Sequence, residues 1–279
     1  MMNYKTSLLT LLFSCFVFIT FGQRTLAPLP ECKNGFIVIA HRGSHLTKPE
    51  NSIAAIEEAI ALGADYVEID LRTTRDGHLV LIHNETVDHT TNGKGRIQDL
   101  NLNEVEKLAL NAKDGQLYKL PDFKEALKAC KNRINIYLDF KAADVVQAYK
   151  EIKSAGMEKQ VLVYINKAEQ YKSWRTLAPK MPLMSGLPKN IKTEEELTSF
   201  LEKMPLEATD NIPNEALFEA MRNNGLSVFL DVQMADEDPI KWKAAMDKGV
   251  QGVQTDHPQA LVEYLQRSNL RNGINMSRR

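Results

Sequence analysis

Short hydrophobic runs alternate with amphipathic segments along the chain from residue 36 onwards. The first run, Phe36 to Ala40, is continuously apolar, as expected of a strand that is buried on both faces. A helical pattern follows over residues 51–62, where Ile53, Ile56 and Ile60 share one face. Further strand-like runs occur at 64–71, 79–83, 134–140, 161–165, 183–185, 206–209, 226–232 and 250–255.

Helical patterns separate most of these runs, for example at 122–131, 143–154 and 214–224. Such an alternation predicts parallel strands with helices packed outside them. We therefore predict an α/β fold, a single (β/α)8 TIM barrel over residues 23–267. The nine strand-like runs are one more than the eight strands of such a barrel, and we interpret 206–209 as the irregular extra segment.

The connection between the second and third runs is too short for a helix. Twelve residues separate Asp70 from His83, and Asp76-Gly77 is a strong tight-turn signal between strand patterns. A parallel crossover normally needs a dozen residues or more. We predict an irregular short connection that projects as a hairpin arm and holds His83 near Asp70.

The first 22 residues differ from the rest of the chain. Lys5 precedes an apolar stretch from Leu8 to Phe21, which is typical of a secretory signal peptide and too short to span a bilayer. We predict a signal peptide at 1–22, export to the periplasm or the medium, and no stable membrane insertion after cleavage. Leu12 to Cys15 loosely resembles a bacterial lipoprotein box, but the apolar run continues past Cys15, which disfavours lipidation. Residues 268–279 are polar, and we expect a disordered tail.

Composition and charge narrow the possible functions. The net charge is −1, so no overall field attracts nucleic acid, and we expect no nucleic-acid partner. After signal cleavage, Cys32 and Cys130 remain, which permits one disulfide and demands none. We favour two unpaired, semi-buried cysteines.

Acidic residues gather where the predicted strands end, which is where barrel enzymes keep their sites. Glu68 and Asp70 are two apart on one strand, so both side chains point to the same face, and Asp139 lies on another strand. Carboxylates inside a barrel mouth repel each other unless a cation joins them. Oxygen ligands suit Mg²⁺ or Ca²⁺ better than Zn²⁺, so we predict one such cation at these three residues.

Two histidines and two basic residues share this rim. His41 and His83 are candidates for a general acid and base, because imidazole titrates near neutral pH. Arg42 has the shape to clamp a phosphate, and Lys141 can share the charge that develops on its oxygens. This set predicts cleavage of a small phosphodiester.

Other polar residues near the rim have plainer interpretations. Asn51 is typical of a helix N-cap. Residues 90–95 are glycine-rich but lack the context of a nucleotide-binding loop, so we interpret them as a turn above the site. His45 is the remaining histidine with the best case for a role, because it lies close to His41.

These residues stand within a longer pattern that resembles the glycerophosphodiester phosphodiesterase family. The resemblance spans nearly the whole mature chain, is dense between 37 and 98, and is thin from 160 to 225. The matching stretches are His41–Gly43, Glu50–Asn51, Gly63–Asp70, Thr74–Gly77, His83, Thr90–Gly95, Pro121–Phe123 and Gly249–Pro258.

The resemblance implies a barrel that uses a divalent cation to hydrolyse glycerophosphodiesters to glycerol 3-phosphate and an alcohol. It implies that His41 and His83 are the catalytic pair and that the three acids are the metal ligands. It places Arg42 and Lys141 at phosphate-binding positions and Glu50 at a position that contacts metal or substrate. It also implies attack by the substrate's own glycerol hydroxyl, giving a cyclic phosphate that water opens.

The chain departs from the family at several positions. Asp139 stands where Glu is usual, Asn84 follows His83 in place of Asp, and His89 replaces an Arg. The family's aromatic–Thr pair on the penultimate strand is Leu230-Asp231, which bears on substrate identity more than on chemistry. We hypothesise that Asp231 selects a cationic or hydroxyl-rich head group.

Two alternative functions stay open. One is a phospholipase D-like or cyclising phosphodiesterase that acts on intact lipids, although the loops show no large apolar patch. The other is a barrel without catalysis that binds a phosphorylated or sugar ligand, although such a protein needs no proton-transfer pair.

Overall fold

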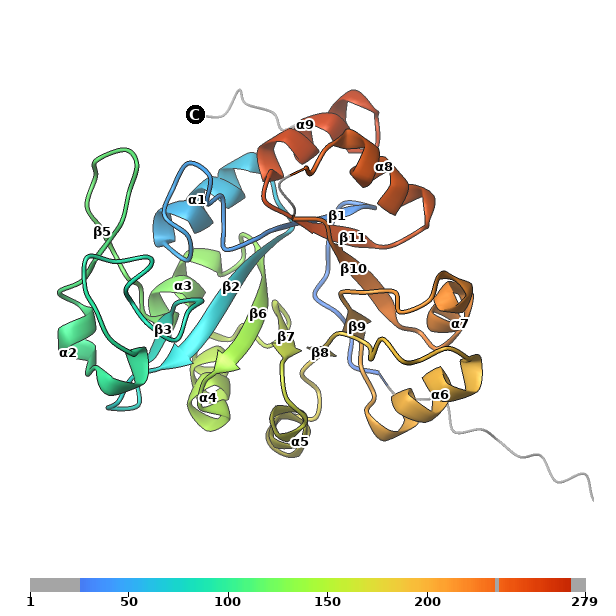
Figure 1. Cartoon of the computed structure of the whole chain (residues 1–279), viewed down its shortest axis with the longest axis horizontal. Helices are drawn as coiled ribbons and strands as arrows, with labels where there is room; N and C mark the ends of the chain where they lie inside the picture. The colour runs from blue at the N-terminus through green and yellow to red at the C-terminus, as the bar shows by residue number, and fades with distance from the viewer. Residues whose placement is uncertain (1–25, 234–235, 272–279) are drawn as a thin grey trace, which may run out of the picture.

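Eight parallel strands form a closed barrel in the computed structural model, which describes residues 26–233 and 236–271 (Figure 1). Pairing of β1 with both β11 and β2 closes the sheet. The predicted TIM barrel is therefore confirmed. In sheet order the strands are β1 (Ile37–Ala40), β11 (Gly252–Thr255), β10 (Ser227–Asp231), β9 (Ala208–Thr209), β8 (Leu183–Met184), β7 (Val161–Ile165), β6 (Asn135–Ala142) and β2 (Tyr66–Thr73).

The assignment of the supernumerary strand was wrong. The run at 206–209 supplies β9, which pairs in parallel with β8 and β10 and belongs to the barrel. The run at 79–83 supplies β3 (Leu79–Leu81), which pairs antiparallel with β2 and stands outside the barrel. A two-residue strand carries too little pattern to reveal that it is needed for closure.

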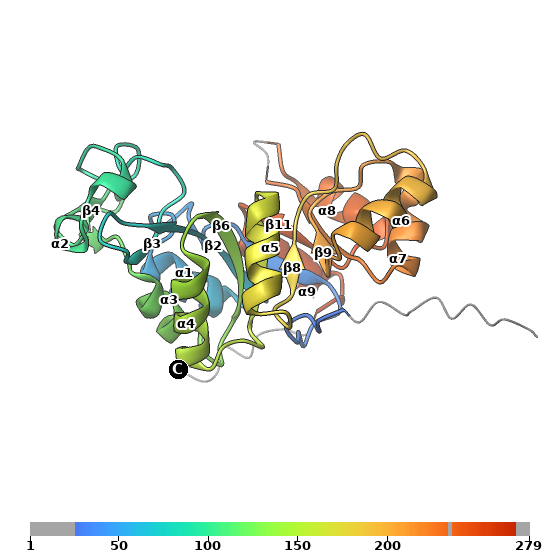
Figure 2. The ribbon, with the colours of Figure 1, turned by 90° about the horizontal axis from the view of Figure 1, so that it is seen from below.

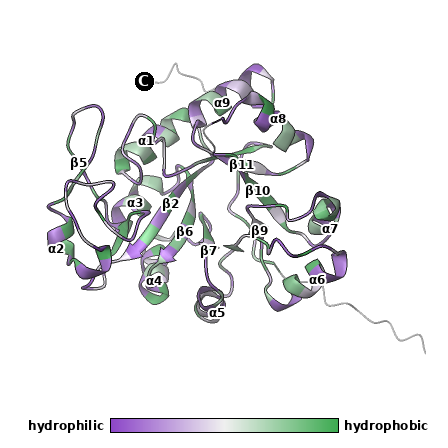
Figure 3. Cartoon of the chain, in the orientation of Figure 1, coloured by the Kyte–Doolittle hydropathy of each residue, from purple (hydrophilic) through white to green (hydrophobic). Residues whose placement is uncertain are grey.

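Helices cover the outside of the barrel. They are α1 (Ile53–Leu62), α3 (Phe123–Cys130), α4 (Val145–Ala155), α5 (Ala168–Leu177), α6 (Glu194–Lys203), η2 (Glu215–Leu217), α7 (Phe218–Asn223), α8 (Pro239–Asp247) and α9 (Pro258–Arg267). Most show both hydrophilic and hydrophobic residues (Figure 3), as helices between a sheet and solvent do. Capping boxes start α3 at Asp122–Glu125 and α6 at Thr193–Glu196.

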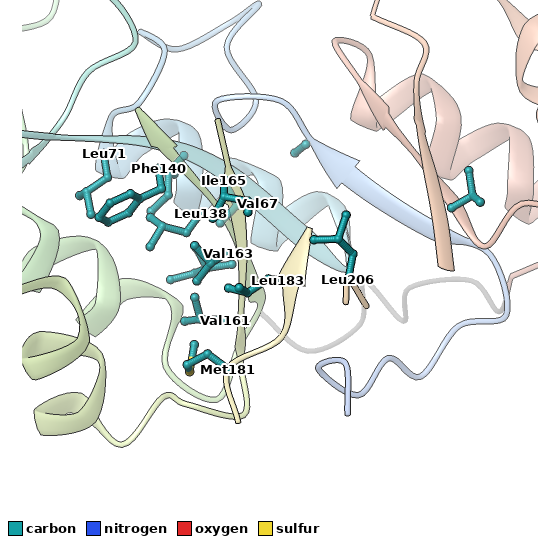
Figure 4. Packing of buried hydrophobic residues seen from close by; sticks show 14 of the residues in the cluster. Val67, Leu71, Leu138, Phe140, Val161, Val163, Ile165, Met181, Leu183 and Leu206 are labelled. Atoms are coloured by element: carbon teal, nitrogen blue, oxygen red, sulfur yellow. The ribbon is translucent and has the colours of Figure 1, made fainter. Parts of the chain in front are cut away.

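Two hydrophobic layers lie on opposite faces of the sheet. The outer layer contains residues such as Val67, Leu138 and Val163, which pack against the helices (Figure 4). The inner layer fills the barrel with Ile39, Tyr66, Tyr137, Leu162, Met184, Ala208 and Phe229. Because side chains alternate along a strand, the residue two positions after each inner-layer residue also points inward, nearer the carboxyl end.

The arm between β2 and α3 carries its own small core. It holds β3, η1 (Ile97–Asp99), α2 (Leu102–Val105) and a hairpin of β4 (Ala109–Leu110) and β5 (Tyr118–Lys119). Its buried residues are Val80, Ile82, Val87, Ile97, Val105, Leu110 and Leu120. Figure 2 shows the arm projecting from one end of the molecule. The predicted hairpin arm is thus confirmed, and it is larger than the turn at Asp76-Gly77.

Both ends of the described chain contact the amino-terminal end of the barrel. The Tyr66 hydroxyl donates to the Pro30 carbonyl, and the Asn135 amide donates to the Glu31 carbonyl. Arg271 is buried and pairs with Asp65, so contacts extend past residue 267, where we expected the barrel to end. The predicted signal peptide and residues 272–279 of the predicted tail lie outside the described residues.

Cys32 and Cys130 are both free, so the expectation of two unpaired cysteines is confirmed. Within residues 26–233 and 236–271, no helix combines the length and apolarity that a membrane span requires.

Gly252 offers a test of barrel closure. A Cβ added there would lie 2.4 Å from the Ile37 carbonyl oxygen, so Gly252→Ala must push β11 away from β1. We expect a loss of about 1–3 kcal/mol of unfolding free energy in urea titrations. Gly35→Ala is the control, because a Cβ there meets nothing within 4 Å. A Gly252→Ala protein as stable as the control would contradict this account of closure.

Candidate active site

Three carboxylates converge inside the carboxyl end of the barrel. Glu68 and Asp70 follow the inward-facing Tyr66 on β2, and Asp139 follows the inward-facing Tyr137 on β6. The two strands are in register, with Asp70 opposite Asp139. One oxygen of each carboxylate lies within 4.8 Å of the others, and Glu68 and Asp70 are 2% and 1% exposed. The structure therefore brings the three predicted metal ligands together.

The charges in this cluster are only partly balanced. Burial, together with the charges of Asp70 and Asp139, raises the pKa of Glu68 well above its usual value. Burial also raises the pKa of Asp139, although Lys141 opposes the shift from 2.6 Å. Lys141 Nζ lies 3.4 Å from Asp70 Oδ1, yet that buried oxygen accepts no hydrogen bond from any described residue.

A divalent cation fits this donor set. The cluster consists of oxygen ligands, which Mg²⁺ and Ca²⁺ prefer. One buried carboxylate oxygen, Asp70 Oδ1, has no hydrogen-bond donor among residues 26–233 and 236–271. A cation among the three carboxylates would offset the repulsion that raises the pKa of Glu68. Glu68, Asp70 and Asp139 are the residues that can hold it.

A tight turn after β1 places His41 and Arg42 beside the cluster. Arg42 and Gly43 both have positive φ, at 51° and 80°, and the backbone N–H of Arg42 donates to Glu68 Oε2 at 2.8 Å. A Cβ on Gly43 would approach Ala55 of α1 to 2.6 Å, so only glycine fits there. The turn therefore requires the glycine of the His-Arg-Gly sequence.

The Arg42 guanidinium lies between two acids. Its Nη1 contacts Glu50 at 3.1 Å and its Nε lies 3.6 Å from Asp70 Oδ2. Glu50 therefore lies in the site through its contact with Arg42, which it holds toward the cluster. Arg42 Nε is buried and finds no hydrogen-bond acceptor in the described part of the chain, so the guanidinium retains a donor for an anionic ligand.

Asn51 is not the N-cap that the sequence suggested. Ser52 caps α1 by accepting from the backbone N–H of Ala55. Asn51 has a φ of 57° and is 2% exposed, and its amide bonds Asp70 twice. Nδ2 donates to Asp70 Oδ2 at 2.8 Å, and Oδ1 accepts from the Asp70 backbone N–H at 2.9 Å. Asn51 therefore orients a predicted metal ligand, as outer-sphere partners of metal sites do.

His41 makes a hydrogen bond that the sequence did not predict. Its Nδ1 lies 2.7 Å from Asp256 Oδ1, across the contact between β1 and the loop after β11. Burial lowers the pKa of His41, and Asp256 opposes that shift. The stretch around Asp256 had been noted in the family resemblance, but nothing in its spacing pointed to His41.

His45 also belongs to this group. Its ring lies edge-on to His41 with centroids 5.4 Å apart, and its Nε2 is 3.7 Å from Asp256 Oδ1. Its Nδ1 lies 2.8 Å from the His41 carbonyl oxygen. A second group of possible metal ligands consists of His41, His45 and Asp256, which lie close together. In this group, however, His41 Nδ1 is already hydrogen-bonded to Asp256.

His83 lies on the returning strand of the arm, and its backbone runs beside β2. Beyond β3, the backbone N–H of Ile82 donates to the Asp70 carbonyl at 3.0 Å, and Arg72 donates to the His83 carbonyl. The expected tether between His83 and Asp70 is therefore present, although His83 does not end a barrel strand. Its Nδ1 lies 2.9 Å from Asn84 Oδ1, so an amide oxygen takes the place that the family gives to Asp.

The loop at residues 90–95 lies in the arm above this face, as expected. A cavity of about 270 Å³ separates it from the loop between β1 and α1. His45, Lys48, Glu50, His89, Thr90 and Lys113 line the cavity.

Comparison with known proteins matches residues 41–260 to the glycerophosphoryl diester phosphodiesterase family. The chain is 31% identical over 242 residues to a glycerophosphodiester phosphodiesterase of Caldanaerobacter subterraneus, covering 83% of this chain and 98% of that one. It is also 27% identical over 250 residues to a glycerophosphodiester phosphodiesterase of Bacillus subtilis, covering 80% of this chain and 84% of that one.

Solved structures show the same fold. A glycerophosphodiester phosphodiesterase from Agrobacterium tumefaciens superposes with a TM-score of 0.72 at 23% identity, covering 82% of this chain and 99% of that one. An Oleispira antarctica phosphodiesterase in complex with the product sn-glycerol-3-phosphate gives a TM-score of 0.69 at 21% identity. The match covers 82% of this chain and 96% of that one.

Replacing Glu68 with Gln tests the charge balance of the cluster. In chelator, we expect Glu68→Gln to raise the unfolding free energy by about 1 kcal/mol, because it removes a buried like charge. The wild type should gain about 2.7 kcal/mol from Mg²⁺ or Ca²⁺ at 100 times its dissociation constant, and the variant much less. Thermal and urea unfolding measure both effects. Glu202→Gln, at an exposed glutamate of α6, is the control. If Glu68→Gln matched this control in unfolding free energy and in its response to metal, the proposed charge balance of the cluster would be refuted.

Asn51→Ala tests the orientation of Asp70. Loss of two buried hydrogen bonds should cost about 1–3 kcal/mol of stability and about 10–100-fold in metal affinity. Urea unfolding and metal-binding calorimetry measure these quantities. The exposed Asn223→Ala serves as control. Unchanged metal affinity in Asn51→Ala would show that Asp70 needs no such support.

Proposed function

This chain belongs to the glycerophosphoryl diester phosphodiesterase family, and from that premise we propose that it hydrolyses glycerophosphodiesters to glycerol 3-phosphate and an alcohol. The observation that carries the proposal is the carboxylate cluster, with Arg42 and Lys141 in contact with it. That arrangement suits a phosphate group held near a divalent cation.

Different side chains have different roles in the proposed reaction. Arg42 and Lys141 are placed to bind the phosphate oxygens, and Glu50 positions Arg42. Glu68, Asp70 and Asp139 would hold the divalent cation, Mg²⁺ or Ca²⁺, whose positive charge would stabilise the phosphoryl group. Asn51 keeps Asp70 in place for that role.

The two histidines exchange the protons. Burial lowers the pKa of His41, so this imidazole is neutral at pH 7 and can accept the proton of the attacking glycerol hydroxyl. Asp256 holds Nδ1–H and stabilises the imidazolium that forms, as a carboxylate does behind a general base. His83, held by Asn84, then donates a proton to the leaving oxygen. Water opens the resulting cyclic phosphate to glycerol 3-phosphate.

Export of the enzyme is a further proposal. It rests on the basic and apolar character of residues 1–22, and places the enzyme in the periplasm or outside the cell. Detection of a mature form that begins near Gln23 in the medium or periplasm would support it, whereas full-length cytoplasmic protein would contradict it.

Alanine at either histidine tests the mechanism. We expect His41→Ala and His83→Ala each to lower kcat/KM by about 10²–10⁴-fold, because each removes a proton-transfer group. The assay is release of glycerol 3-phosphate from glycerophosphocholine with Mg²⁺ or Ca²⁺, and chelator should abolish it. His78→Ala, an exposed histidine of the arm, is the control.

The same assay separates the alternatives. Cyclic phosphate released from intact lipids, with no glycerol 3-phosphate from glycerophosphocholine, would favour the lipid-cleaving enzyme. Binding without turnover would favour a barrel that has lost catalysis.

A further inference from the structure

The rim of the barrel has a second polar face, which the proposed mechanism does not use. Asp210 follows the inward-facing Ala208 of β9 by two residues, and Asp231 follows the inward-facing Phe229 of β10. On β11, Gln254 is in register with both Asp231 and the inward-facing Ile39. Three adjacent strands therefore direct two carboxylates and an amide into the same part of the barrel.

These side chains lie close together. The backbone N–H of Asp231 contacts the Asp210 carbonyl at 3.4 Å, and the Tyr164 hydroxyl donates to Asp210 Oδ2 at 2.9 Å. Gly186, after β8, leaves space here, because a Cβ at that position would come within 3.0 Å of Asp210 Oδ1. Asp231 is exposed at the mouth, and Asp210 and Gln254 lie deeper.

The negative charge on this face is not neutralised. Among the described residues, no Lys, Arg or His side chain lies within 4.0 Å of an Asp210 or Asp231 carboxylate, whereas Arg42 and Lys141 contact acids across the mouth. Partial burial, then the charges of Asp210 and Asp139, raise the pKa of Asp231 to about 7, and the charge of Lys141 only partly opposes the rise. A positive charge placed here would stabilise the ionised carboxylates and lower the pKa of Asp231.

Hydrogen-bond donors are also missing. Gln254 is 5% exposed, and within the described residues its buried Oε1 accepts no hydrogen bond. Asp210 Oδ1 is likewise a buried acceptor without a donor. Buried acceptors are normally satisfied, so two of them beside an exposed carboxylate indicate a ligand that donates hydrogen bonds.

We propose that Asp231, Asp210 and Gln254 form the subsite that recognises the alcohol half of the substrate, and that this alcohol carries a primary ammonium group. A primary ammonium provides both the charge and the N–H donors that this face lacks. A quaternary ammonium provides only the charge, and a neutral polyol provides only donors. The inference rests on the proposed hydrolysis of glycerophosphodiesters and names its substrate class.

A substrate panel tests the subsite. Glycerophosphoethanolamine, glycerophosphocholine and glycerophosphoglycerol share the phosphodiester and differ in the head group. For the wild type, we expect kcat/KM to be highest for glycerophosphoethanolamine, about tenfold above glycerophosphoglycerol, with the difference mainly in KM. Asp231→Asn should remove that preference, because it should lower kcat/KM about tenfold more for glycerophosphoethanolamine than for glycerophosphoglycerol.

Controls make the outcomes distinct. Glu202→Gln removes the same charge from an exposed site on α6 and should keep the wild-type preference. Equal losses on all three substrates, or an unchanged preference in Asp231→Asn, would overturn the subsite. A choline preference equal to the ethanolamine preference would overturn its hydrogen-bonding part.

Binding separates the subsite from the chemistry. If the wild type cleaves none of the three compounds, the proposed hydrolysis fails. Calorimetry of glycerophosphoethanolamine and glycerophosphoglycerol with wild type and Asp231→Asn then still decides the subsite. Tighter binding of the ethanolamine compound that disappears in Asp231→Asn supports the subsite, and equal binding refutes it.

Discussion

Closure of a parallel sheet, combined with the two-residue alternation of strand side chains, is the constraint on which this protein depends. Seven of the eight strands contribute an apolar residue to the inner layer. On β2 and β6, Tyr66 and Tyr137 are followed by polar residues two and four positions later. The inner layer excludes water from the middle of the barrel. The polar residues are therefore held as a ring at the rim, and their neighbours are set by strand order rather than by sequence distance.

The ring is electrostatically uneven. On the β2 and β6 side, Glu68, Asp70 and Asp139 are crowded, but Arg42 and Lys141 approach them. On the β9 and β10 side, Asp210 and Asp231 have no basic partner among the described residues. The first arrangement suits a phosphate and a cation, and the second suits a positively charged alcohol. A glycerophosphodiester with an amine head group carries a negative phosphate, which suits the first side, and a positive ammonium, which suits the second.

Support for the reactive groups comes from outside the barrel strands. The turn after β1 adopts positive φ at Arg42 and Gly43 because Gly43 lies against Ala55 of α1. The arm returns along β2 and thereby places His83 beside Asp70. Asn51 and Asp256 then orient Asp70 and His41 through buried or half-buried contacts.

The sequence by itself determined the barrel class, the arm, and the three acidic residues that gather at the mouth of the barrel. Continuous apolar runs predicted strands buried on both faces, and the spacing of Glu68 and Asp70 predicted a shared inward face, because strand periodicity is a local property. Only the tertiary structure decided which runs close the barrel, since two-residue strands such as β9 carry almost no pattern. It also decided that Asn51 bonds Asp70, that Asp256 pairs with His41, and that Asp210, Asp231 and Gln254 are neighbours. Those contacts join residues 19 to 215 positions apart or lie across adjacent strands, and they depend on closure, which no local pattern encodes.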